Sequence, residues 1–144
     1  MKTLGFALLA LVTLALPASA EKAELKGAAL MAHPAAKVAL ENMALMHAGK
    51  IEDAVKMGTK AMQADWKALP DEDRKMMSEM MQHFAVPDAE FRAEVEKFGT
   101  LTVDGDKASL VVEKTTKDEN GSGTETKTIH LMKEEGQWRV TRGK

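Results

Sequence analysis

The chain has 144 residues, with 20 Lys and Arg against 22 Asp and Glu, for a formal net charge of −2. A balance this close to neutral argues against the basic surface that is typical of nucleic-acid-binding proteins. The sequence contains no cysteine, so the fold cannot depend on disulfides and must be held together by its hydrophobic core.

Residues 1–20 have the pattern of a signal peptide. Lys2 gives a positive start, residues 4–16 form an apolar run too short to span a bilayer comfortably, and Ala18-Ser19-Ala20 is a small-residue cleavage site. We therefore expect cleavage after Ala20, a periplasmic or secreted protein, and no membrane association once the peptide is removed. Residues 21–33 are predicted to be a flexible lead-in, and residues 34–142 to form one domain.

Four helices are predicted before residue 99. Apolar residues recur at helical spacing, and breaks fall at Gly49, Pro70, Pro87 and Gly99. The expected helices begin at Pro34, Ile51, Asp71 and Asp88. The second is predicted to be continuous as far as Leu69.

The C-terminal third alternates apolar and polar residues around three glycine-containing turns, which is typical of hairpins. If the turns centre on Asp104-Gly105, Asn120-Gly121 and Glu135-Gly136, Leu101 lies opposite Ala108, Leu110 opposite Leu131, and Leu131 opposite Val140. One face of the sheet then collects the apolar side chains of Leu101, Val103, Ala108, Leu110, Val112, Ile129, Leu131, Trp138 and Val140. The sequence thus predicts an α+β fold, with N-terminal helices packed on a curved four-stranded antiparallel sheet.

Residues 101–140, LTVDGDKASLVVEKTTKDENGSGTETKTIHLMKEEGQWRV, resemble the C-terminal sheet of the small secreted DUF4878 domains, which belong to the NTF2-like, cystatin-like superfamily. The motif segments are residues 103–108 and 131–140. The resemblance implies a fold rather than a function, because these residues occupy turn and core positions. In that family a loop usually follows the first pair of helices. Residues 59–85 therefore form either a longer helical lid or a broken helix.

An apolar sheet face under Met-rich helices predicts a cleft for a small apolar ligand or a segment of a protein partner. The residues expected to line it are Trp66, Leu110, Val112, Ile129, Leu131 and Trp138. NTF2-like enzymes, as the resemblance implies, place an Asp or His in this position, but the predicted face has no titratable residue. His47 and Asp65 are the only nearby candidates for a general base. We therefore expect an exported, non-enzymatic binding or accessory domain without a cofactor.

The eleven methionines have three interpretations that the sequence leaves open. They are flexible fillers of the core, an exposed surface for a partner or a second copy, or soft ligands for Cu(I) in a periplasmic copper-handling protein. The candidate metal ligands are Met43, Met46, His47, Met76, Met77, Met80, Met81 and His83. A homodimer through the polar sheet face, around His130, is also left open.

Overall fold

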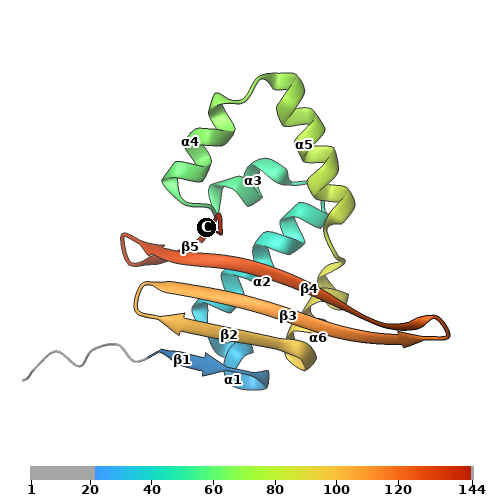
Figure 1. Cartoon of the computed structure of the whole chain (residues 1–144). Coiled ribbons are helices and arrows are strands. Elements are labelled where there is room, and N and C mark those ends of the chain that lie inside the picture. The colour runs from blue at the N-terminus through green and yellow to red at the C-terminus, as the bar shows by residue number, and fades with distance from the viewer. Residues whose placement is uncertain (1–21, 144) are drawn as a thin grey trace, which may run out of the picture.

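Six helices and five strands make up residues 22–143, the part of the chain that the computed structural model describes (Figure 1). The predicted signal peptide, residues 1–20, lies outside the described residues. In chain order the elements are β1 (Ala23–Leu25), α1 (Gly27–Ala32), α2 (Pro34–His47), α3 (Ile51–Lys56), α4 (Lys60–Ala68), α5 (Asp71–Phe84), α6 (Asp88–Phe98), β2 (Gly99–Asp104), β3 (Lys107–Asp118), β4 (Gly121–Glu134) and β5 (Gln137–Thr141).

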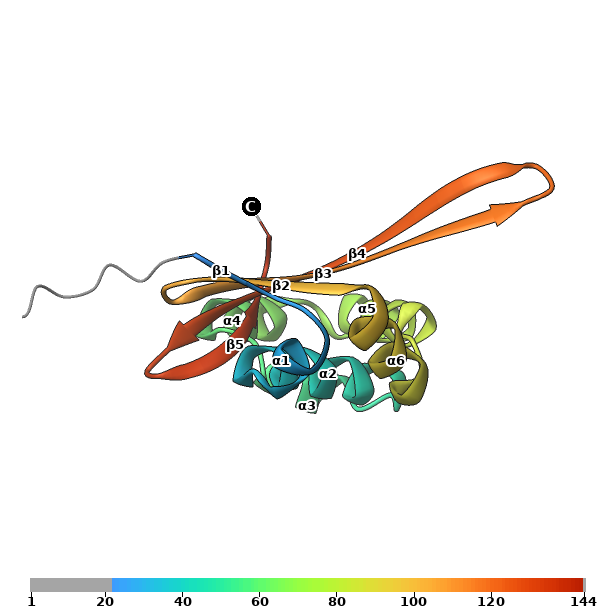
Figure 2. The same cartoon turned by 90° about the horizontal axis from the view of Figure 1, so that it is seen from below.

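The strands form one antiparallel sheet in the order β1-β2-β3-β4-β5, and the helices lie on one of its faces (Figure 2). The α+β class is therefore confirmed. The sheet has five strands rather than the four that were predicted.

The extra strand comes from the segment that was expected to be a flexible lead-in. Ala23–Leu25 pairs with β2, with Leu25 opposite Leu101, and Leu30 of α1 is fully buried. The expectation for residues 21–33 differs from the structure because a three-residue strand and a six-residue helix are too short for a periodic pattern to show. These two elements are held in place by the pairing of β1 with β2 and by the burial of Leu30.

The predicted register is confirmed in the last hairpin and displaced in the first two. Leu131 lies opposite Val140, as expected, and Glu135 and Gly136 both have positive φ, which is the geometry of a type I′ turn. The turn of the first hairpin is centred one residue later than predicted, and that of the second is centred one residue earlier. Leu110 therefore pairs with Leu101 on one side and with Ile129 on the other. Such a slip moves the pairing by two residues and keeps each side chain on its predicted face.

The predicted helix from Ile51 to Leu69 is broken between α3 and α4. The connecting residues run beside β5: Val140 donates from its N–H to Met57 O at 3.0 Å, and Thr59 donates to Val140 O at 2.9 Å. The Thr59 side chain then caps α4 by accepting a hydrogen bond from Met62 N. The broken-helix alternative is therefore correct, and the connection covers part of the β5 edge.

The core lies between α1, α2, α6 and the central strands. Its largest fully buried side chains are Leu30, Leu40, Phe91, Val95, Leu101, Leu110 and Leu131. Burying one such side chain contributes about 1.5–3 kcal/mol. All nine residues of the predicted apolar face belong to this core or pack against it.

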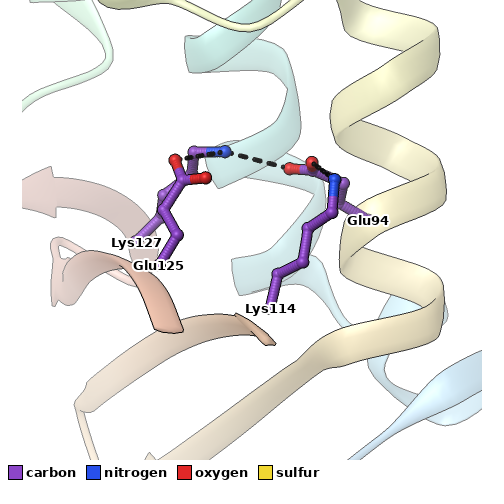
Figure 3. Close-up of polar contacts among 4 residues, drawn as sticks. All are labelled: Glu94, Lys114, Glu125 and Lys127. Carbon is purple, nitrogen blue, oxygen red and sulfur yellow. Dashed lines mark hydrogen bonds and ion pairs between the residues drawn. The ribbon is translucent and has the colours of Figure 1, made fainter. Parts of the chain in front are cut away.

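β3 and β4 continue beyond the other strands as a two-stranded arm, residues 113–126, which extends past the helices (Figure 2). At its base Glu94 of α6 lies between two lysines (Figure 3). Glu94 Oε1 is 3.2 Å from Lys114 Nζ, and Glu94 Oε2 is 3.1 Å from Lys127 Nζ. Burial by itself raises the pKa of the Glu94 carboxyl, but the hydrogen bonds and charges of the two lysines outweigh burial and hold that pKa below its usual value.

Candidate functional site

A cavity of about 310 Å³ lies where α2, α3, α4 and α5 meet the β4–β5 end of the sheet. Figure 1 shows α4 and α5 extending past this edge of the sheet. Five of the lining residues are methionines: Met43, Met46, Met62, Met77 and Met81. Most of the remaining wall is also apolar, formed by Ala54, Val55, Trp66, Leu69, Ile129 and Val140.

Helical spacing explains how the methionines converge. Met43 and Met46 are three residues apart on α2, and Met77 and Met81 are four apart on α5, so each pair shares one helix face. None of the described residues of α5 is buried. Met77 and Met81 are half-buried because their side of α5 faces the cavity rather than the main core.

Two partly polar side chains are built into the wall. Trp66 is buried, and its Nε1 donates a hydrogen bond to Glu52 Oε1 at 3.0 Å. Asn42, with 7% of its surface exposed, donates from Nδ2 to the Ala54 carbonyl oxygen at 2.9 Å.

The sheet contributes Thr128, His130 and Thr141 to the polar part of the lining, and Arg142, directly after β5, completes it. Arg142 is exposed and forms an ion pair with Asp65 of α4, Nη1 to Oδ2, at 3.1 Å. The site therefore has an apolar helical wall and a polar side along the end of β5.

Only some of the residues predicted to line the cleft lie at the cavity. Trp66 and Ile129 line the cavity, whereas Leu110, Val112 and Leu131 are almost fully buried in the core. Trp138 lies at a second, more open hollow beside Pro34, Val38 and Met57. The reason is that α2 and α6 pack directly on the central strands, so the cavity lies at the edge of the sheet rather than over its centre.

Only some of the predicted metal ligands lie at the cavity as well. Met43, Met46, Met77 and Met81 line the cavity, and Met76 and Met80 are 63% and 50% exposed. His47 Nδ1 hydrogen-bonds to the Ala85 carbonyl oxygen, and His83 packs edge-on against Phe84. Neither histidine lines the cavity.

The lining residues missing from both candidate sets include Asn42, Met62 and His130. Met62 lies four residues before Trp66, a spacing that places both on one face of α4 and is readable from the sequence. Asn42 and His130 carried no such signal, because their position depends on how α2 and β4 meet the other helices.

No three His, Cys, Asp or Glu side chains gather into a metal-binding group anywhere in residues 22–143. A metal in this cavity would meet mainly thioether sulfurs, with the imidazole of His130 in the same lining. The candidate bases His47 and Asp65 both lie outside the lining of the cavity.

Within the described part of the chain, no helix has the length and apolar character needed to cross a membrane. A scan against protein-family models, a search of curated proteins and a search of solved structures found no match to this chain.

Proposed function

We propose that the protein is an exported, non-enzymatic binding or accessory domain whose methionine-lined cavity takes a small apolar ligand or an apolar segment of a protein partner. The observation that carries the proposal is the convergence of five methionines and Trp66 on one cavity of about 310 Å³. That volume is near the lower end of the range for ligand pockets, roughly 300–1,000 Å³. It is about twice the volume, roughly 150 Å³, of an engineered apolar cavity that binds benzene.

The side chains suit such a ligand. Methionine is flexible and polarisable, so its side chain adapts to apolar shapes better than a branched one. A wall segment with little buried surface is displaced at low cost, and α5 buries none of its described residues. α5 is therefore the wall through which we expect the ligand to enter.

The test is a titration with the neutral dye N-phenylnaphthylamine, followed by dye emission and by quenching of tryptophan emission. Met81→Lys places a charge in the cavity and should weaken dye binding at least tenfold. Met80→Lys, on the exposed side of the same helix, is the matched control and should bind as the unmodified protein does. Met81→Gln and Met80→Gln repeat the comparison without a charge if the lysine variant unfolds. No saturable binding, or equal loss in both members of a pair, would contradict the proposal.

The same five thioethers support a second candidate, Cu(I) handling. Soft thioether ligands suit Cu(I), and here they come from three helices around one space. We expect Cu(I) affinity, measured by competition with a chromogenic chelator, to fall when Met43, Met46, Met62, Met77 and Met81 are changed to leucine. Changing Met76 and Met80 to leucine is the control. Equal affinity in the two variants would exclude cavity thioethers as the ligands.

Export and family membership are part of the same proposal. The charged start, apolar run and Ala18-Ser19-Ala20 site support a signal peptide. Helices on one face of an antiparallel sheet support the NTF2-like, DUF4878-like relationship. The mass of the exported protein tests the first part, since cleavage after Ala20 leaves a chain that begins at Glu21.

A further inference from the structure

The β4 strand has an unpaired edge that begins beside the cavity. β5 pairs with β4 only from Glu134 back to His130, which lies opposite Thr141. β4 itself continues to Gly121, paired on its other side with β3. Thr128, Ile129 and His130 line the cavity. The free edge of β4 therefore starts where the wall of the cavity ends.

Strand alternation shows which main-chain groups this edge presents. Glu134 and Gln137 close the two-residue β4–β5 turn, so the even-numbered residues of β4 direct their N–H and C=O groups toward β5. The odd-numbered residues direct theirs toward β3, as the hydrogen bond from Lys133 N to Asp106 O shows. Beyond the end of β5, the groups on the open edge belong to Thr128, Thr126 and Thr124.

The other described edges of the sheet lack this combination. β1 has only three residues, and β5 is covered at Val140 by residues 57–59. The free part of β3, residues 113–118, contributes no lining to either described cavity. The free part of β4 has no proline and no bulge, two features that commonly protect exposed edges.

We propose that the natural ligand of the cavity is an extended peptide segment of a partner protein, which adds as a strand to β4 at Thr124–Thr128 in line with β5. This inference rests on the proposed function. Successive side chains of a strand point to opposite faces, so every second side chain of the added segment points toward the helix side. There an apolar side chain enters the methionine-lined cavity, while main-chain hydrogen bonds to β4 hold the segment.

The chemistry of the arm argues for a partner rather than a second copy. Residues 113–126 are charged, hydroxyl-bearing, amide or glycine residues, without one apolar side chain. An arm from a second copy would pair with the edge but would bring nothing to fill the cavity. The partner segment must instead alternate apolar residues with small polar ones.

The experiment uses a blocked nine-residue peptide that alternates leucine and threonine and has lysine at both ends. We expect saturable binding and slowed hydrogen exchange at the main-chain N–H groups of Thr124, Thr126 and Thr128. Thr126→Pro removes one outward donor without touching the β3–β4 ladder, and should weaken peptide binding at least tenfold. Thr115→Pro, on the free edge of β3, is the matched control and should leave peptide binding unchanged. Both variants should still bind N-phenylnaphthylamine.

The outcomes separate this inference from the proposed function. Dye binding without peptide binding would overturn strand addition and leave the apolar cavity standing. If the unmodified protein binds neither the dye nor the peptide, both this inference and the proposed function would be overturned. A doubled native mass with these amides protected in the absence of peptide would show a second copy on the edge and contradict the inference. If Thr126→Pro fails to fold, a peptide N-methylated at the amides that face β4 replaces it, and unchanged affinity would overturn the proposal.

Discussion

Asn42 on α2 donates a hydrogen bond from Nδ2 to the carbonyl oxygen of Ala54 on α3, over 2.9 Å. Both residues line the cavity, and both are buried. A buried amide hydrogen bond is directional, so this one fixes how α2 and α3 meet at the wall. The shape of the cavity therefore depends on a polar group within an otherwise apolar set of residues.

Asn42→Asp tests this bond with almost no change of shape. An ionised aspartate has no donor for Ala54 O, and its charge is buried beside methionines, so we expect a loss of at least about 1–3 kcal/mol of unfolding free energy. Burial raises the pKa of such a carboxyl, and the protonated form regains a donor. The loss should therefore be larger at pH 8 than at pH 4. Urea unfolding at the two pH values measures it, and a pH-independent loss would contradict this explanation.

Glu94 should stabilise the protein only while it is ionised. Its pKa in the folded protein lies below the ordinary value of 4.5, so its contribution is present above that value and is lost as the pH falls through the folded pKa. Glu94→Gln should lower stability at pH 7 by about 1.5–3 kcal/mol, the usual contribution of hydrogen bonds to charged groups. The free energy of unfolding of the Glu94→Gln variant should also vary less between pH 6 and 3 than that of the unmodified protein. If the acid-unfolding curves of the variant and of the unmodified protein are parallel, the two lysines do not lower the pKa of Glu94.

His33 should make stability depend on pH near neutrality. Its Nδ1 accepts a hydrogen bond from Ala35 N at 3.1 Å and caps α2. Burial lowers the pKa of the imidazole, and the charge of Lys133 lowers it further. The folded pKa is thus below 6.5, so this stability is complete above pH 6.5 and is lost as the pH falls through the folded pKa.

The matched variant for His33 is asparagine, which caps helices without titrating. We expect the difference in unfolding free energy between the unmodified protein and His33→Asn to change between pH 7.5 and pH 5, with the histidine form losing more. His33→Ala should cost about 1 kcal/mol at pH 7.5, because the cap is removed. If the His33→Asn difference is the same at both pH values, the imidazole does not act as an unprotonated cap.

Gly99 joins α6 directly to β2, and the junction leaves no space for a side chain. A Cβ at this position would lie 2.3 Å from the Val95 carbonyl oxygen, although φ is an ordinary −78°. Gly99→Ala should therefore destabilise the protein by about 1–3 kcal/mol through overpacking. Gly123→Ala, whose nearest neighbour would be 3.9 Å away, is the control and should change stability by less than about 0.5 kcal/mol. Thermal unfolding of both variants measures the difference.

The sheet was largely predictable because alternation needs only local sequence. The face that holds Leu101, Leu110 and Leu131 followed from period two, and it survived a slip in two turns. β1 was not predictable, because three residues have no period. The break before α4 was also hidden: Ile51, Ala54 and Trp66 keep a helical stripe across a connection that β5 holds in place.

The site was predictable in composition but not in position. The methionine pairs on α2 and α5 indicated which helices contribute to it. The sequence did not show which side of α5 faces inward, since methionines occupy both sides, with Met77 and Met81 at the cavity and Met76 and Met80 exposed. That choice depends on the tertiary packing of α5 against α2 and α3.

The most direct test of the cavity is an NMR titration of isotope-labelled methionine methyl groups with N-phenylnaphthylamine. We expect shifts that saturate together for the cavity residues Met43, Met46, Met62, Met77 and Met81, with Met76 and Met80 unchanged as internal controls. Shifts confined to Met76 and Met80 would place binding on the outer surface of α5. Either that result or the absence of any saturable shift would contradict the assignment of the cavity as the binding site.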